Sequence, residues 1–184
     1  MNKKGFTLIE LVVAMGVFLS LFLIVIVNFR SGESINELRL ETQKIASDIR
    51  KVQTLSLTGS DYNNASVGVG GYGIMFKANN NDYVIFNDVN ADGVYTLAAD
   101  GAVLETRSLV PDINTLQITG TNDELHIVFK PYSSNVSIYT VLGSADPVLQ
   151  SSTTSLSLTH SRATNKTGTV SITPVSGKVD FTLE

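Results

Sequence analysis

The sequence predicts an α+β fold in which a long N-terminal helix precedes an antiparallel β head. Residues 6–29 form a nearly unbroken apolar run, and apolar spacings of three, four and seven continue beyond it. After Gly59 the apolar residues alternate with polar ones, and turn residues separate the alternating segments. These patterns indicate a lipid-facing helix half at 6–29, an amphipathic half at 30–58 and a β-rich head at 59–184.

The apolar run is long enough to cross a membrane. It covers 24 residues from Phe6 to Phe29. As a helix this is about 36 Å, and a bilayer core is about 30 Å thick. Lys3 and Lys4 precede the run, and the positive-inside bias therefore predicts a single-pass protein of the cytoplasmic (inner) membrane, with its N-terminus in the cytoplasm and its head outside. A secretory signal fits poorly because its apolar region is shorter; a plain signal anchor is the alternative.

The helix is expected to continue to Leu57, because Thr58-Gly59-Ser60 is typical of a helix end. One face carries an apolar stripe at helical spacing, formed by Ile35, Leu38, Ile45, Ile49 and Val52, with Thr42 filling the gap. The other faces carry charged residues such as Asp48 and are expected to lie in water. Ser31-Gly32, near the membrane exit, is the position where the helix is expected to bend.

Short, half-buried strands are predicted in the head. The alternation is found at Tyr72, Ile74 and Phe76, at Leu125, Ile127 and Phe129, at Leu156 and Leu158, and at Val170 and Ile172. The clearest hairpin is Gly168–Pro174 returning as Lys178–Leu183, with Val179, Phe181 and Leu183 facing inward. No second helix is expected after residue 59.

Composition argues against several classes of function. Without cysteine, the chain has no disulfide, thiolate nucleophile or cysteine-ligated metal. A net charge of -4, with no basic cluster beyond Lys3-Lys4, gives no electrostatic footprint for broad nucleic-acid binding. His126 alternates with apolar neighbours and is expected to face solvent, whereas His160 is in phase with apolar positions and is expected to be partly buried. No placed nucleophile and base are recognisable, so a non-enzymatic protein is expected.

The N-terminus carries the most specific motif. Residues 4–11, Lys4-Gly5-Phe6-Thr7-Leu8-Ile9-Glu10-Leu11, resemble the leader and cleavage site of type IV prepilins, which pilins share with the pseudopilins of type II secretion. The resemblance implies a pilin-like fold and removal of residues 1–5 by a prepilin peptidase that cuts between Gly5 and Phe6. It also implies N-methylation of Phe6 and a Glu at the fifth position of the mature chain, which here is Glu10.

Elementary chemistry gives these residues the same roles. Gly5 offers a backbone without a side chain, which a protease at the membrane face can approach closely. Glu10 lies within the apolar run, where an acidic residue costs about 2.5–3.5 kcal/mol at the centre of a membrane helix and less near an end. Its natural partner is the Phe6 amine of the same or a neighbouring chain, which makes Glu10 a candidate assembly residue. The alternative is that Glu10 lies in the headgroup region, where the helix dipole tolerates it.

The head shows a second resemblance. Val84–Gly93, Leu104-Glu105 and Pro174–Val179 resemble segments of the H-type (GspH/FimT-like) minor pseudopilins of type II secretion and the related minor pilins of type IV pili. This implies a β-sandwich packed on the C-terminal half of the helix. The sequence departs from pilins in having Val27 where a mid-helix proline is often found, and in lacking a C-terminal cysteine pair. Both departures disfavour an adhesive major pilin.

A calcium site is one interpretation of the loop that starts at residue 88. The candidate ligands are Asp88, Asn90, Asp92, the Val94 carbonyl, and either Asp100 or Glu105. Their alternate spacing, with Gly93 at the sharp turn, matches the start of an EF-type loop. The twelfth position is Ala99, so the carboxylate that completes such loops is out of register. A plain turn between strands Tyr83–Phe86 and Val94–Leu97 would select the same residues.

The sequence therefore favours a minor pseudopilin or pilin that assembles through its N-terminal helix into a periplasmic or extracellular filament of type II secretion or a type IV pilus. Expected partners are other pilin or pseudopilin subunits, prepilin peptidase, the inner-membrane assembly platform and the membrane. One alternative is a competence-type minor pilin that binds DNA through Arg162, Lys166 and Lys178. The other is a membrane-tethered binding module that does not polymerise.

Overall fold

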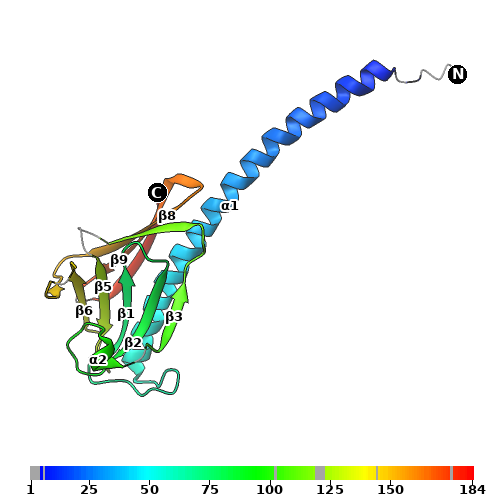
Figure 1. Cartoon of the computed structure of the whole chain (residues 1–184). Helices are drawn as coiled ribbons and strands as arrows, with labels where there is room; N and C mark the ends of the chain where they lie inside the picture. Colours follow the sequence, from blue (N-terminus) through cyan, green and yellow to red (C-terminus); the bar gives the residue numbers. More distant parts are fainter. Residues whose placement is uncertain (1–4, 6, 102, 119–122, 144, 175) are drawn as a thin grey trace.

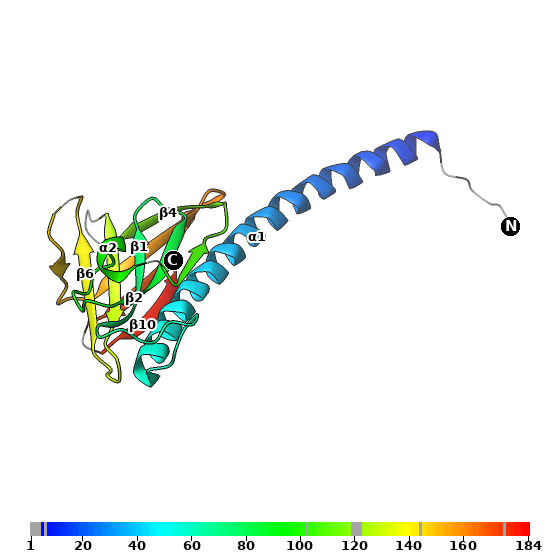
Figure 2. The same ribbon diagram turned by 60° about the horizontal axis from the view of Figure 1, so that its bottom comes forward.

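A stalk helix and a two-sheet head make up the computed structural model, which describes residue 5 and residues 7–101, 103–118, 123–143, 145–174 and 176–184. Helix α1 (Leu8–Thr58) projects alone from the head over its N-terminal half and lies along the sheets over its C-terminal half (Figure 1). The view in Figure 2 shows β10 beside the helix. The predicted α+β, pilin-like architecture is confirmed. The helix continues through Ser31-Gly32 without interruption.

The head contains a six-stranded and a four-stranded antiparallel sheet, with the orders β3-β2-β1-β5-β6-β7 and β10-β9-β8-β4. The first sheet consists of β1 (Gly71–Lys77), β2 (Asp82–Asp88), β3 (Glu105–Ser108), β5 (Glu124–Phe129), β6 (Val136–Val141) and β7 (Val148–Leu149). The second consists of β4 (Ile113–Ile118), β8 (Thr154–His160), β9 (Ala163–Thr173) and β10 (Lys178–Leu183). A short helix, α2 (Leu97–Asp100), lies between β2 and β3 in the chain.

The segment after β2 differs from the prediction. The sequence favoured a strand over Val94–Leu97 and no second helix, whereas the structure has a loop followed by the single turn of α2. The Asp100 carboxylate accepts hydrogen bonds from the Val89 N–H (3.0 Å) and the Thr96 N–H (2.9 Å). These backbone donors are therefore satisfied inside the loop, and they need no partner strand.

A row of isoleucines crosses the six-stranded sheet. Ile74 pairs with Ile85 on β2 and with Ile127 on β5, and Ile127 pairs in turn with Ile138 on β6. All four side chains are fully buried. The four-stranded sheet contributes to the same core Leu156, Leu158, Val170 and Ile172. Because a slip of one residue would turn the whole row to the opposite face, burial fixes the strand register.

The predicted stripe is the face that α1 buries. Five of its six members, Leu38, Thr42, Ile45, Ile49 and Val52, are each at most 1% exposed, and Ile35 is partly exposed. They belong to the half of the helix that packs against β9, β10 and β1. The closest approach is at Gly168 on β9, where an added Cβ would overlap the hydroxyl of Thr42. A glycine is required there because the helix occupies the space of a side chain.

Polar contacts also join α1 to the head, although its charged faces were expected to lie in water. Asp48 is only 6% exposed. It accepts a hydrogen bond from the Tyr83 hydroxyl (2.6 Å) and pairs with Arg107 (3.0 Å), so the buried carboxylate is satisfied by two donors. Burial raises the pKa of Tyr83, and Asp48 raises it further, which keeps the hydroxyl protonated. Two residues further along the helix, Arg50 donates to the Val179 carbonyl (2.7 Å).

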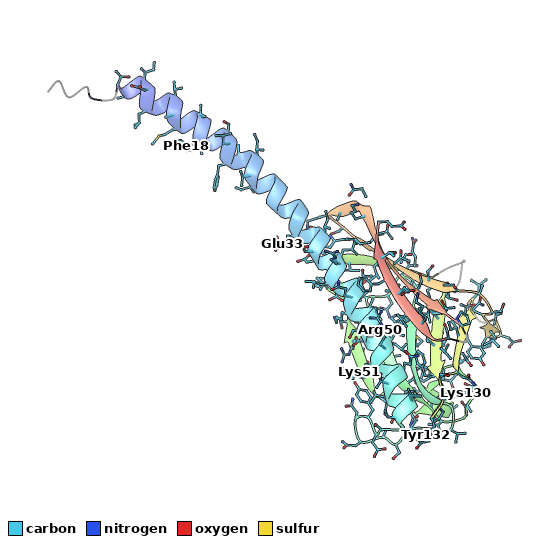
Figure 3. The ribbon with its side chains drawn as sticks, turned by 180° about the vertical axis from the view of Figure 1, so that it is seen from behind. Phe18, Glu33, Arg50, Lys51, Lys130 and Tyr132 are labelled. Atoms are coloured by element: carbon cyan, nitrogen blue, oxygen red, sulfur yellow. The ribbon has the colours of Figure 1, made fainter. Side chains whose placement is uncertain are left out.

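The C-terminal end of α1 is fixed by its cap. Gly59 adopts the left-handed conformation (φ 63°), which ends the helix at low steric cost. Ser56, in the last turn, accepts two hydrogen bonds from the head. Its carbonyl accepts from the Tyr132 N–H (3.0 Å), and its hydroxyl oxygen accepts from the Tyr72 N–H (2.9 Å). Figure 3 shows Tyr132 beside this end of the helix. The helix end is thus attached to β1 and to the loop after β5.

Phe181 lies on the inward face of β10, as predicted, but it is only partly covered. It is 38% exposed, whereas Val179 on the same strand is 5% exposed. Phe181 pairs with the buried Val170, but β10 is an edge strand. One side of the Phe181 ring therefore has no neighbouring strand to cover it.

Replacing Gly168 by Val should destabilise the head, because the new side chain would overlap Thr42. Overpacking of this kind costs about 2 kcal/mol, which corresponds to a fall of roughly 8 °C in Tm for a head of this size. Thermal unfolding of the full-length chain in detergent, followed by circular dichroism, measures the change. The matched control is Thr169→Val on the other face of β9, which should shift Tm by less than about 2 °C. An unchanged Tm for Gly168→Val would contradict the close packing.

Candidate functional site

The predicted processing site precedes the first helix. Gly5 is exposed, and no atom outside its chain neighbours lies within 4 Å of the position of an added Cβ. Helix α1 begins after Thr7, whose backbone is extended (φ -80°, ψ 150°). The backbone of Gly5 is therefore open to an enzyme. Phe6, the predicted site of N-methylation, lies outside the described residues, as do residues 1–4.

Thr7 caps the helix through Glu10. The Thr7 hydroxyl accepts a hydrogen bond from the Glu10 N–H (3.3 Å) and donates weakly to the Glu10 carboxylate (3.5 Å). The pair resembles a capping box, and the Thr-x-x-Glu pattern that signals it was present in the sequence. Glu10 thus lies in the first turn, where the helix dipole favours a negative charge. Among the described residues, no cation pairs with Glu10.

The N-terminal half of α1 is an uncovered apolar rod. Residues Leu8–Ile26 have a mean hydropathy of 2.8, and none is buried. Phe18, for example, is 74% exposed and projects from the stalk far from the head (Figure 3). The 19 residues span about 28 Å, close to the thickness of a bilayer core. The segment is consistent with the membrane anchoring that is typical of pilins.

Four of the predicted calcium ligands lie on the segment from the end of β2 to α2. Asp88 ends β2 and is buried, and its carboxylate accepts from the Gly93 N–H (3.1 Å). Asp100, on α2, is also buried. Asn90 and Asp92 are exposed in the turn between them, and the Asn90 amide donates to Asp92 Oδ2 (2.6 Å). The structure thus places the four side chains on one segment, but the carboxylates of Asp88, Asp92 and Asp100 do not all lie within 4.8 Å of one another.

The remaining two candidate ligands differ in their surroundings. Val94 lies in the same turn, and its N–H donates to Asp92 Oδ1 (2.9 Å). Glu105 lies on β3, where its carboxylate contacts the Tyr62 hydroxyl and accepts from Arg107 Nε (2.8 Å). The Glu105 carboxylate is therefore engaged by two donors at the start of β3.

His126 is fully buried, which corrects the prediction that it faces solvent. Its Nδ1 accepts from the Tyr95 N–H (3.1 Å), so the proton is assigned to Nε2, which lies 3.4 Å from a Glu124 oxygen. Burial lowers the pKa of His126, and Glu124 opposes that shift. The prediction was wrong because both faces of β5 are covered, one by the core and the other by the loop that contains Tyr95. A strand covered on both faces loses its period-two pattern.

A second buried imidazole belongs to a cluster with two carboxylates. His160 Nε2 lies 2.9 Å from Glu37 on α1, and the ligand atoms of His160, Glu37 and Asp112 are all within 4.8 Å of one another. Metal ligation by Nε2 is disfavoured, because the Arg162 N–H donates to His160 Nδ1 (3.1 Å) and the ring proton therefore belongs on Nε2. The cluster instead joins β8 to the stalk. His160 was expected to be partly buried, and at 1% exposed it is more deeply buried than expected.

The three cations considered for DNA binding do not form one patch. Arg162 precedes β9, whereas Lys178 pairs with Thr173 at the other end of that strand. Eleven residues of extended chain separate these ends by roughly 35 Å. Each of the two cations is paired on the surface, Arg162 with Asp112 and Lys178 with Asp180 (2.7 Å). Lys166 is half-buried on β9.

Comparison with known proteins supports the assignment of the N-terminus. Residues 1–26 match the family described as the prokaryotic N-terminal methylation motif. The match supports a protein of the type IV pilin-like class, whose members are structural and not enzymatic. More specifically, the motif indicates a prepilin-like substrate of prepilin peptidase. No curated protein matches the chain, and no solved structure matches it either.

The lowered pKa of His126 predicts a loss of stability in mild acid. Below about pH 6.5 the unfolded chain takes up a proton at this imidazole, while the folded chain resists protonation. The stabilisation is thus complete above that pH and is lost as the pH falls through the folded pKa. We expect the Tm of the full-length chain to fall by roughly 5 °C between about pH 7.5 and 5.5. His126→Gln should flatten this dependence, and an equally steep profile in the variant would contradict the role of His126.

Proposed function

We propose that this chain is a non-enzymatic filament subunit, a minor pseudopilin or minor pilin that assembles through α1 after cleavage between Gly5 and Phe6. The observation that carries the proposal is the coincidence of the matched motif, residues 1–26, with the uncovered apolar half of α1. An apolar surface of this extent must be covered. The membrane covers it before cleavage, and the helices of neighbouring subunits cover it in the filament.

Cleavage converts the N-terminus from an anchor into an assembly element. It removes Lys3 and Lys4, which hold the leader at the cytoplasmic face, and it creates an amine at Phe6. In the apolar bundle that amine pairs with Glu10 of an adjacent subunit. The low dielectric strengthens this pair and makes either charge costly if it is left alone. The pairing therefore sets the axial register between subunits.

The head supports assignment to the H-type minor pseudopilins and the related minor pilins. The resemblance of the head to these proteins implied two sheets packed on the C-terminal half of the helix. The structure has two sheets, and both contact that half of α1. The head lies outside the cytoplasmic membrane, in a filament of type II secretion or of a type IV pilus. Its partners are other subunits, the prepilin peptidase and the inner-membrane assembly platform. DNA binding is not favoured, because Arg162 and Lys178 lie at opposite ends of β9.

Gly5→Val should block processing, since a β-branched side chain obstructs the protease at the cut site. The variant should accumulate in the membrane at full length when it is expressed with a prepilin peptidase. Mass spectrometry of the N-terminus distinguishes the two forms. Thr7→Ser, which retains the capping hydroxyl, is the control and should be processed normally. Cleavage of Gly5→Val at the wild-type rate would contradict the assigned site.

Glu10→Gln should be processed and inserted normally but enter filaments poorly, because the amide cannot neutralise the Phe6 amine of a neighbour. We expect at least a tenfold depletion from sheared filaments, corresponding to about 1.4 kcal/mol of lost pairing. Glu33→Gln, an exposed position on the same helix, is the matched control and should assemble normally (Figure 3). Wild-type incorporation of Glu10→Gln would refute the register role. A processed wild-type chain that never enters filaments would instead support a tethered binding module.

A further inference from the structure

One buried carboxylate oxygen in the head lacks a partner. Asp88 is 1% exposed, and while its Oδ2 accepts from the Gly93 N–H (3.1 Å), its Oδ1 is buried without a hydrogen-bond partner among the described residues. The carboxylate also fills the space that a side chain at Gly70 would need, so its surroundings are closed on that side. A buried ionised oxygen that loses water without gaining a partner destabilises the folded chain.

Two further carboxylates increase the negative charge around Asp88. Asp100 is 8% exposed, and its Oδ1 accepts from the N–H of Val89, the residue next to Asp88 (3.0 Å). Asp92 lies in the turn between them. Burial raises the pKa of Asp88, and the charges of Asp100 and Asp92 act in the same direction, whereas the nearby N–H groups of Gly93 and Ala91 oppose them. Residues 88–101 contain no Lys, Arg or His. The loop therefore concentrates negative charge without a cation of its own.

We propose that the loop between β2 and α2 binds one calcium ion, with Asp88 Oδ1 as its central ligand. The other ligands are Asn90, Asp92, Asp100 and the Val94 carbonyl. Backbone N–H groups hold the carboxylates of Asp88, Asp92 and Asp100 on this one segment. Their oxygens do not all lie within 4.8 Å of one another, so they must move closer together when the ion binds. The site belongs to the head alone, and it does not depend on whether the chain polymerises.

The donor set selects a hard cation. All proposed ligands are carboxylate, amide or carbonyl oxygens, which calcium accepts in flexible geometry, whereas magnesium requires a near-ideal octahedron and retains several waters. Gly93 makes the sharp turn at φ 82°, and the Tyr139 ring would overlap an added Cβ. Glu105 is left out because Tyr62 and Arg107 hold its carboxylate on β3. Without a completing bidentate Glu, a dissociation constant of about 10⁻⁴–10⁻³ M is expected, the range of extracellular calcium modules.

Thermal unfolding of the full-length chain in detergent tests the proposal, with calcium chloride, magnesium chloride or a chelator added. Calcium at about ten times its dissociation constant should raise Tm by roughly 5 °C over the chelated state. Asp88→Asn should lose this increase, while its Tm in chelator should equal or exceed that of the wild type, because the variant no longer buries an unpaired charge. Equilibrium dialysis should find one calcium ion per wild-type chain and none in the variant.

Asp92→Asn and Asp180→Asn provide the matched comparison, because both change an exposed aspartate and only the first lies in the loop. Asp92→Asn should weaken calcium binding at least tenfold, whereas Asp180→Asn should bind as the wild type does. An unchanged wild-type Tm together with no bound calcium would overturn the proposal and leave a plain turn. If magnesium chloride raised Tm as much as calcium chloride does, the assignment of the site to calcium would be overturned. A full calcium response in Asp88→Asn would show that the ion binds elsewhere.

Discussion

The burial of one stripe on the C-terminal half of α1 is the interaction on which the architecture depends. The same unbroken helix carries an uncovered apolar surface over Leu8–Ile26 and a buried one from Leu38 to Val52. The helix runs through Ser31-Gly32, between the two surfaces, without interruption. The direction of the anchor and the position of the head are therefore set by one element, and neither changes without moving the other.

Two buried histidines make the same pair of contacts. In each, Nδ1 accepts a backbone N–H and Nε2 faces a glutamate. His126 fastens the loop after β2 to β5 through the Tyr95 N–H, while His160 fastens the end of β8 to Glu37 on the stalk. Since a doubly protonated imidazole could not accept at Nδ1, both attachments require the neutral ring. The loop that carries the candidate cation site is thus anchored at its far end by a side chain from another strand.

Local patterns predicted the elements of the fold well, because each depends on residues close in sequence. The helical stripe, the alternation at Tyr72, Ile74 and Phe76, and the last hairpin are all of this kind. The predictions that failed concern which other parts of the chain pack over a given helix or strand. His126 was placed in solvent because alternation cannot reveal a loop lying over the outer face of β5, and Asp48 was placed in water because its partners come from β2 and β3.

In the candidate site, too, the features that depend on residues close in sequence could be predicted, and those that depend on tertiary contacts could not. The N-terminal motif could be identified because its residues are consecutive in the sequence. The Thr7 cap could also have been predicted from the Thr-x-x-Glu pattern, but it was not recognised. In contrast, the unpartnered Asp88 oxygen, the engagement of Glu105 by Tyr62, and the separation of Arg162 from Lys178 all follow from the pairing of strands distant in sequence. Turn chemistry and a metal loop select the same residues, so spacing alone could not distinguish them.

The attachments along the last turns of α1 have a mechanical consequence. Asp48, Arg50 and Ser56 bond to β2, β3, β10, β1 and the loop at Tyr132 over about 12 Å of helix. A tensile force on the stalk loads these bonds and the apolar stripe together, since the helix between them is continuous. The helix cannot be peeled from the head one contact at a time, and extraction requires the contacts to shear at once. The head is therefore joined to its stalk most strongly along the axis of the helix.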